Sequence, residues 1–295
     1  MKKIRSILLI LLFFCGCLNC ITIEVKASEI TDDLTSKDKV TIIQKNFIEN
    51  KDIYYTYSNS LEDLCLPKII DGVTMNFESD LELYNIIGED NRRPVSAQNI
   101  FTIFAYYLDD NTATRGTGFL VARNTIATCA HCVYHPELGK FPDYILLYFA
   151  DRTDPVYVSL EDTIFNFDEN YFSGQPAGTD WTVGFIGENL GTGFAYEANS
   201  TIGIGTNIYV IGNQGETYPS LYMDNGVVKR LETSSTGVRM HYDADAAPGW
   251  SGGPVFNLNG TVIGIHASGG TLTNGGTLIT PAIFQTIYDT VHMFD

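Results

Sequence analysis

A serine set between glycines constrains this chain more than any other feature. Residues 249–254 read Gly-Trp-Ser-Gly-Gly-Pro, which predicts a sharp turn that exposes the hydroxyl of Ser251. Because Gly249 has no side chain, its N–H and that of Ser251 can point into one space. Two such donors stabilise the oxyanion that forms when a serine attacks a carbonyl. Glycine-rich turns also contain serine for steric reasons, so the motif alone has only moderate specificity.

Two residues with complementary chemistry lie upstream of this turn. His131 stands in Ala-His-Cys, and Asp180 precedes the apolar run that begins at Trp181. A serine hydroxyl needs a neighbouring base, imidazole exchanges a proton near neutral pH, and a carboxylate can fix the imidazole tautomer. A buried histidine or a turn aspartate is the ordinary interpretation of either residue alone. The order His, Asp, Ser differs from the Asp-His-Ser and Ser-Asp-His orders of other serine hydrolases, and it predicts a catalytic triad.

These motifs resemble those of the trypsin/chymotrypsin-like serine peptidases, and more closely those of the secreted bacterial glutamyl endopeptidases (the staphylococcal glutamyl protease-like family). The shared marks are Ala-His-Cys at 130–132, Asp180, Gly-Xaa-Ser-Gly-Gly-Pro, and Val-Ile-Gly-Ile-His at 262–266. The likeness extends from roughly residue 85 to the C-terminus. It implies an all-β, chymotrypsin-like double antiparallel β-barrel with a C-terminal helix, a serine endopeptidase activity on protein or peptide substrates, and no cofactor.

Short β-branched stretches separated by turn residues support this fold class. Strands are expected over 100–108, 116–122, 125–128 and 144–149. The same pattern of short β-branched runs and turn residues continues from 201 to 266. We expect an N-terminal barrel at 85–193, with His131 and Asp180, and a C-terminal barrel at 194–295, with Ser251. Residues 281–291 carry apolar side chains at three- and four-residue intervals, which predicts a terminal helix that packs on a barrel.

The first 84 residues have a different character. Residues 1–27 combine a basic start, a continuous apolar run and a small-residue cleavage site, which predicts a signal peptide and a secreted, extracellular protein. A lipid anchor at Cys17 is the alternative. Residues 28–84 carry no catalytic motif and are interpreted as a propeptide, with a short helix from Val40 to Ile48. The alternative is an N-terminal extension that stays attached.

The resemblance places the mature N-terminus around Asn85 to Ile87. In trypsin the freed N-terminus pairs with an aspartate just before the catalytic serine. Here that position is Trp250, so the same salt bridge cannot form. In the glutamyl branch the freed amino group approaches the specificity pocket instead, and the resemblance implies the same arrangement here.

The balance of charge restricts the partners of this protein. The chain carries a net charge of −17, and a protein this acidic repels nucleic acid and anionic lipid. We therefore expect no nucleic-acid partner and no stable membrane association after signal cleavage. Strong acidity also favours solubility, which is the simpler explanation, and a monomer is expected. The sequence has no Asp-rich calcium loop of the EF-hand type.

The resemblance implies a substrate pocket built around His266. In the family a histidine at this place binds the carboxylate of a glutamate substrate, because imidazole donates a hydrogen bond and can carry positive charge; a buried structural histidine is the alternative. Where the family usually has threonine, this chain has Ala246, and loss of a hydroxyl donor there weakens acid selectivity by about 1–3 kcal/mol. Ser268 could compensate. The edge that pairs with substrate backbone is expected at Ala267, Ser268 and Gly269.

Two further functions stay open at this point. Asp245 stands where trypsin keeps the acid that binds basic side chains, so cleavage after Arg or Lys is the alternative to cleavage after Glu. Glutamyl members commonly have Asp there as well. A secreted protease-like protein that binds without turnover is the competing class, and the intact set of His131, Asp180 and Ser251 argues against it.

Six cysteines occur in the chain. Only Cys129 and Cys132 lie in the catalytic part; the others are Cys15, Cys17, Cys20 and Cys65. The family usually pairs the cysteine after the catalytic histidine with a partner at the position of Gly116, so the usual bridge is absent. Cys129 and Cys132 could pair with each other, bind a metal or remain buried thiols. A Cys-x-x-Cys pair needs two more ligands for zinc, and His135 is the one nearby candidate, so no metal is expected.

Overall fold

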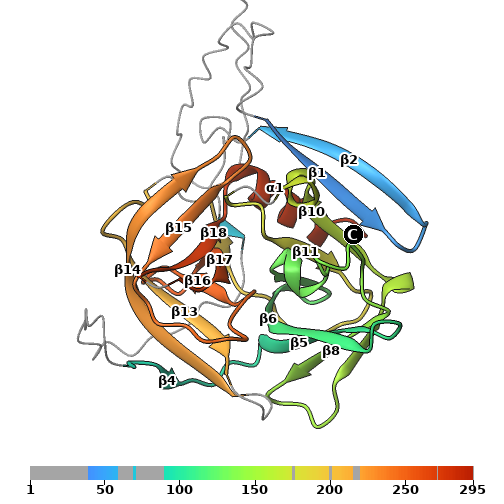
Figure 1. Cartoon of the computed structure of the whole chain (residues 1–295), viewed down its shortest axis with the longest axis horizontal. Coiled ribbons are helices and arrows are strands. Elements are labelled where there is room, and N and C mark those ends of the chain that lie inside the picture. The colour runs from blue at the N-terminus through green and yellow to red at the C-terminus, as the bar shows by residue number, and fades with distance from the viewer. Residues whose placement is uncertain are drawn as a thin grey trace, which may run out of the picture. The chain divides into compact units, whose positions relative to one another are not determined.

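The computed structural model describes residues 39–58, 69–70, 90–174, 177–198, 201–214, 220–270 and 272–294 (Figure 1). The expected signal peptide, most of the expected propeptide and the expected maturation site lie outside these residues, as do the four N-terminal cysteines. The described elements are β-strands, short 3₁₀ turns and one α-helix, which confirms the all-β, chymotrypsin-like fold class. No described helix combines the length and the apolar composition needed to cross a bilayer.

The first sheet has nine antiparallel strands and carries the histidine side of the site. Its order is β2-β1-β10-β11-β7-β6-β5-β8-β9, and this path ends at β2 and β9 without closing. The strands expected near 100, 116, 125 and 144 are all present. The bounds are β1 (Lys39–Asn46), β2 (Lys51–Ser58), β5 (Ile100–Tyr107), β6 (Thr112–Ala122), β7 (Thr125–Thr128), β8 (Tyr144–Phe149), β9 (Val156–Ser159), β10 (Ile164–Asp168) and β11 (Thr182–Phe185).

The second sheet contains a closed six-stranded barrel, because β16 pairs with both β13 and β17 (Figure 1, orange to red). Three short strands extend it: β12 runs parallel to β17, β3 pairs with β12, and β4 pairs with β14. The bounds are β3 (Ile69–Ile70), β4 (Arg93–Pro94), β12 (Tyr196–Glu197), β13 (Asn207–Asn213), β14 (Leu221–Thr233), β15 (Val238–Tyr242), β16 (Pro254–Phe256), β17 (Val262–Ser268) and β18 (Asn274–Leu278).

The expected short helix at Val40–Ile48 is wrong. This segment forms strand β1, which pairs with β2 on one side and with β10 on the other. Val40 and Ile42 alternate into the core and are fully buried, as β-branched side chains do on a pleated, half-buried surface. Pairing with distant β10 therefore outweighs the local helical signal that the sequence carries.

The terminal helix α1 (Pro281–Val291) has the bounds that the sequence predicts. It begins at a cap where the hydroxyl of Thr280 accepts the N–H of Ile283, with proline in the first turn, as is favoured at helix starts. Its apolar face is buried, and Thr290 accepts a hydrogen bond from the Asn166 amide on β10 at 3.0 Å. The helix is thus fixed to the first sheet.

Two tryptophans anchor the loops that carry the candidate site. Trp181 follows Asp180 and Trp250 precedes Ser251, and both indoles are fully buried. A side chain on Gly212 of β13 would collide with the Trp250 ring, so glycine is required beneath it. Because each indole is buried, it fixes the position of the neighbouring backbone, and so of the partly exposed Asp180 and Ser251.

Candidate active site

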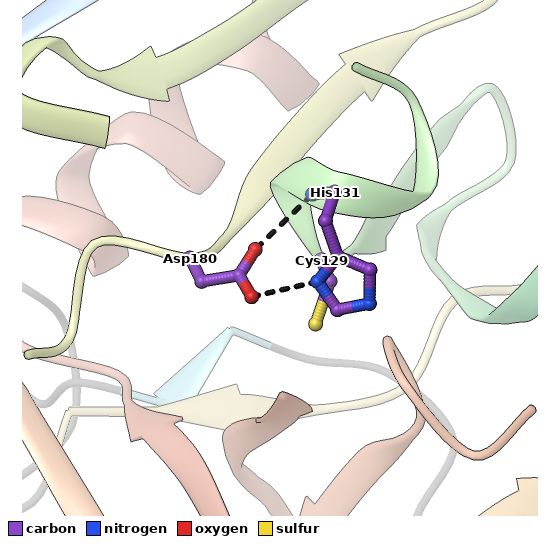
Figure 2. Close-up of side chains that lie close together, drawn as sticks. All are labelled: Cys129, His131 and Asp180. Carbon is purple, nitrogen blue, oxygen red and sulfur yellow. Dashed lines mark hydrogen bonds and ion pairs between the residues drawn. The ribbon is translucent and has the colours of Figure 1, made fainter. Parts of the chain in front are cut away.

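His131 and Asp180 meet because their strands are neighbours. β7 and β11 pair with Thr128 opposite Thr182, and His131 lies in the 3₁₀ turn η3 (Ala130–Cys132) just after β7. The Asp180 carboxylate accepts two hydrogen bonds from His131, one from the imidazole Nδ1 at 2.7 Å and one from the backbone N–H at 3.1 Å (Figure 2). With its proton held on Nδ1, the imidazole presents Nε2 as an acceptor.

The same pair sets the basicity of the imidazole. Burial alone would lower the pKa of His131, but the negative charge of Asp180, with a further contribution from neighbouring Cys132, outweighs burial and raises that pKa well above its ordinary value. The His131 and Asp180 side chains are 32% and 27% exposed. The imidazole is therefore a strengthened base that solvent and substrate can still reach.

The turn that holds Ser251 is fixed from both sheets. The Gly252 N–H donates to the His266 carbonyl at 2.7 Å, and the Thr117 N–H donates to the Ser251 carbonyl at 2.7 Å. The Ser251 hydroxyl donates to the carbonyl of Ala267 at 3.5 Å. Among the described residues no hydrogen bond joins Ser251 to His131, so the structure brings His131 and Asp180 together and leaves the third contact of the triad unformed. Such contacts are often loose without substrate.

The backbone around Gly249 leaves two donors unused. Within the described part of the chain, no hydrogen bond uses the N–H of Gly249 or of Ser251, whereas the N–H of Trp250 donates to Ala247 at 3.0 Å. Gly249 has a φ of 101°, which favours glycine. Arg115 donates to the Pro248 carbonyl at 3.2 Å. The Gly249 N–H belongs to the same planar peptide unit, so it points away from Arg115. Sequence reasoning missed Arg115, because it is distant from Pro248 in the chain.

His266 lies in a more buried place than the sequence suggests. Its side chain is almost fully buried, and its Nδ1 lies 2.6 Å from the hydroxyl of buried Tyr242. Burial lowers the pKa of His266 to about 3, so the imidazole is neutral at neutral pH. Burial also raises the pKa of Tyr242 well above its ordinary range, which keeps its proton. Burial therefore favours a neutral His266 over the positive charge that the sequence suggests, and a neutral imidazole can still donate a hydrogen bond from Nε2.

The other expected pocket residues have different surroundings. Asp245 accepts the N–H of Asn91 at 3.3 Å, so its carboxylate is tied to the segment that leads to β4. Ala246 packs against the core of the second barrel. Ala267 faces the Ser251 hydroxyl through its carbonyl, and the Ser268 hydroxyl accepts a hydrogen bond from Arg239. Gly269 lies next, close to Asn274.

The two cysteines beside His131 are free and buried. A Cβ placed on Gly116 would lie 3.5 Å from the Cβ of Cys132, a separation found in disulfides. Gly116 therefore occupies the partner position of the bridge that the resemblance implies. With no partner at Gly116, the Cys132 thiol donates to the Ser251 carbonyl at 3.5 Å. The Cys129 thiol donates to the His266 carbonyl at 2.9 Å.

One group of metal-type ligand atoms coincides with the site. Ligand atoms of Cys129, His131 and Asp180 lie within 4.8 Å of one another (Figure 2). The sequence pointed to His135 instead, because it is near the cysteines in the chain. In the structure Asp180 is engaged by His131, and a metal here would have to replace that hydrogen bond.

Comparison with known proteins agrees with the fold. Residues 116–265 match the trypsin-like peptidase domain. The extracellular metalloprotease of Bacillus subtilis is 26% identical over 222 residues, 70% of each chain. The glutamyl endopeptidase of Bacillus licheniformis is 26% identical over 223 residues, 69% of this chain and 68% of that protein. A solved Glu endopeptidase in complex with MPD has a TM-score of 0.56 at 22% identity, over 70% of this chain and 99% of that chain.

A closed barrel, a second open sheet and a histidine–aspartate pair near a serine turn define a chymotrypsin-like serine peptidase. The matched domain spans just over half of the chain, and the protein belongs to the trypsin-like peptidase family. It is a serine endopeptidase whose substrates are proteins or peptides, and it is related to the glutamyl endopeptidase of Bacillus licheniformis.

Proposed function

We propose that the protein is a secreted endopeptidase that cleaves after glutamate through Ser251, His131 and Asp180. The observation that carries the proposal is the pair of hydrogen bonds from His131 to Asp180, beside a serine turn with two unused backbone donors. Nε2 of His131 takes the Ser251 proton as Oγ bonds to the substrate carbonyl carbon. The N–H groups of Gly249 and Ser251 bind the oxyanion.

The same groups complete turnover. His131 returns the proton to the departing amine, which breaks the peptide bond and leaves an acyl group on Ser251. Water then loses a proton to His131 and attacks the acyl carbon, and the product carboxylate leaves as Ser251 regains its proton. Asp180 stays ionised and stabilises the imidazolium that forms in each half of the reaction.

Selection for glutamate is supported by neutral hydrogen-bond donors. If the Tyr242 hydroxyl donates to Nδ1 of His266, the imidazole proton is on Nε2 and can be donated to a carboxylate. The alternative, cleavage after Arg or Lys, requires a free Asp245 carboxylate. The Oδ2 of that carboxylate accepts the Asn91 N–H, which reduces but does not remove its capacity to bind a basic side chain, and the His266 donor supports cleavage after an acidic residue. The lost hydroxyl at Ala246 leaves His266 with a larger share of the selectivity.

A peptide library tests this specificity, and its products are expected to end in glutamate. His266→Ala should lower kcat/KM for a glutamate substrate by about 10- to 100-fold, the cost of one hydrogen bond to a charged group. Tyr242→Phe should lower it less, because the imidazole remains and loses only the partner that orients it. Tyr222→Phe, on β14, is the matched control.

An ester with an uncharged side chain separates the pocket from the catalytic machinery. Hydrolysis of this ester should change little in His266→Ala. Equal losses on both substrates would remove His266 from the pocket. Products that end in lysine or arginine would move the specificity to Asp245.

We further propose that residues 28–84 are a propeptide that follows a signal peptide. The B. subtilis relative is named as extracellular, which supports export. Part of the segment is built into the first sheet, where β1 pairs with β10 and Gln44 donates to Asn166 at 3.1 Å. Cleavage near residues 85–87 would free an N-terminus a few residues before Asn91, and Asn91 contacts Asp245 next to the proposed pocket.

N-terminal sequencing of the secreted protein is expected to find a chain that starts near residues 85–87. Because β1 is paired and buried, the same sample should be examined for a retained fragment containing residues 39–58 by denaturing electrophoresis. A single chain that starts at Ser28 would contradict the propeptide and favour an extension that stays attached.

A further inference from the structure

Arg239 lies against the edge expected to bind substrate, although no catalytic motif includes it. In the second barrel Arg239 on β15 is opposite Thr277 on β18, and Gly275 on β18 is opposite Ser268 on β17. The Arg239 guanidinium donates to the Ser268 hydroxyl. A side chain on Gly275 would come within 2.8 Å of the Arg239 Nε. The glycine thus makes room for the guanidinium beside Ser268.

Arg239 and His266 lie on opposite faces of this sheet. His266 is opposite Gly276 and Ser268 is opposite Gly275, with a bulge at the residue between them. Successive residues of β18 point to opposite faces, so the His266 and Ser268 side chains do too. Arg239 is therefore placed to contact a different substrate side chain from the one that His266 contacts.

No ion pair joins Arg239 to an acidic side chain in the described part of the chain, although the Glu232 carboxylate, opposite on β14, attracts it from beyond ion-pair distance. The Arg239 Nε is buried and makes no hydrogen bond there. Glu232 lies across the strand pair, but its carboxylate contacts His241 at 2.9 Å and Arg230 at 3.0 Å. Other cations do have acidic partners, namely Lys45, Arg92, Lys140 and Lys229. A partly buried cation with an unmade hydrogen bond is costly, and an anion from a ligand would satisfy it.

A bound peptide would bring alternate side chains to the two faces. The Ala267 carbonyl lies 3.5 Å from the Ser251 hydroxyl. A peptide whose carbonyl is attacked by Ser251 can therefore run antiparallel to residues 267–269, as an added strand. The residue that contributes this carbonyl, P1, then lies opposite Ala267. Its N-terminal neighbour, P2, lies opposite Ser268. If P1 points to the His266 face, P2 points to the Arg239 face.

We propose that Arg239 forms a second acid-selective subsite, which binds an Asp or Glu side chain at P2. The proposal rests on the proposed function for the position of P1. It also accounts for how a protein with a net charge of −17 accepts acidic peptides. The overall field repels such substrates, and a cation at this subsite would offset part of that repulsion.

Matched peptides that differ only at P2 test the proposal. With glutamate at P1, the peptide with Glu at P2 is expected to have a kcat/KM about tenfold above that with Gln at P2, and added salt should reduce the ratio. Arg239→Gln should bring the ratio to one. Arg239→Lys should keep part of it. Arg230→Gln, an exposed arginine on β14, is the matched control and should keep the full ratio.

Several results would overturn the proposal. One is a wild-type ratio of one, which needs no variant and so is informative even if Arg239→Gln does not fold. Another is a ratio that persists in folded Arg239→Gln, with its active sites counted by a fluorophosphonate. If the library shows cleavage after a residue other than glutamate, the proposed P1 selectivity fails. Two new peptides, with the observed residue at P1 and Glu or Gln at P2, then give the same ratio of kcat/KM values.

Discussion

Ser251→Ala is expected to lower kcat by about 10⁶-fold, the loss found when the nucleophile of such a triad is removed. The change deletes the atom that would form the acyl-enzyme. It should not disturb the fold, because the contacts that fix the turn use backbone atoms. Thr117 donates to the Ser251 carbonyl, and Gly252 donates to the His266 carbonyl. Both contacts remain in the variant.

Peptide hydrolysis and labelling by a fluorophosphonate measure this effect together. Ser173→Ala is the matched control, because its hydroxyl is exposed and its hydrogen bond within the described residues is to the carbonyl of Asn170; it should retain full activity and labelling. One relative is named a metalloprotease, so a metal chelator is added to the wild-type enzyme and should leave its activity unchanged. Activity that survives in Ser251→Ala, or that is lost to the chelator and not to the fluorophosphonate, would contradict the serine mechanism.

Local patterns in the sequence predicted the parts of the molecule that depend on neighbours in the chain. The terminal helix was predictable because Thr280, Pro281 and an apolar repeat define its start and its buried face. The strands of the first sheet that lead to His131 were predictable from β-branched runs bounded by turns. The order of His131, Asp180 and Ser251 limited the fold to one class because only one arrangement of barrels uses it.

Features that depend on pairing between distant strands were not predictable in this way. The sequence of β1 predicts a helix and the structure has a strand, since the partner β10 is more than a hundred residues away. The neutral state of His266 follows from burial, and its contact with Tyr242 crosses the neighbouring strands β15, β18 and β17. Arg239 reaches Ser268 by the same route. A single sequence gives the residue types at these positions but not the register that brings them together.

The state of Cys129 and Cys132 also depends on contacts between segments that are distant in the chain. Absence of the usual bridge was evident from Gly116, but the fate of the two thiols was left open. Their burial beside the His266 carbonyl and the serine turn depends on contacts between the two sheets. The grouping of ligand-type atoms from Cys129, His131 and Asp180 was not predictable for the same reason, because Asp180 is near Cys129 in space and far from it in the chain.

Asp180→Asn is expected to lower kcat by about 10⁴-fold at neutral pH, because an amide in this place favours the wrong imidazole tautomer. An Asn side chain can still accept the His131 backbone N–H, but its amide nitrogen would donate to Nδ1. The ring proton then moves to Nε2, and Nε2 can no longer accept the Ser251 proton. The fold should persist, since the Thr277 hydroxyl holds the backbone carbonyl of residue 180.

The pH profile of kcat/KM separates this role from a purely structural one. In the wild type, catalysis requires neutral His131, whose pKa is raised by Asp180, so activity should fall with decreasing pH along a limb above the ordinary histidine range. Without the carboxylate the pKa falls, and the limb should move to lower pH while the plateau drops. Asp110→Asn, which breaks an exposed ion pair with Lys140, should change neither feature. If Asp180→Asn lowered the plateau with no shift of the limb, Asp180 would not set the charge of His131, and the raised pKa would need another cause.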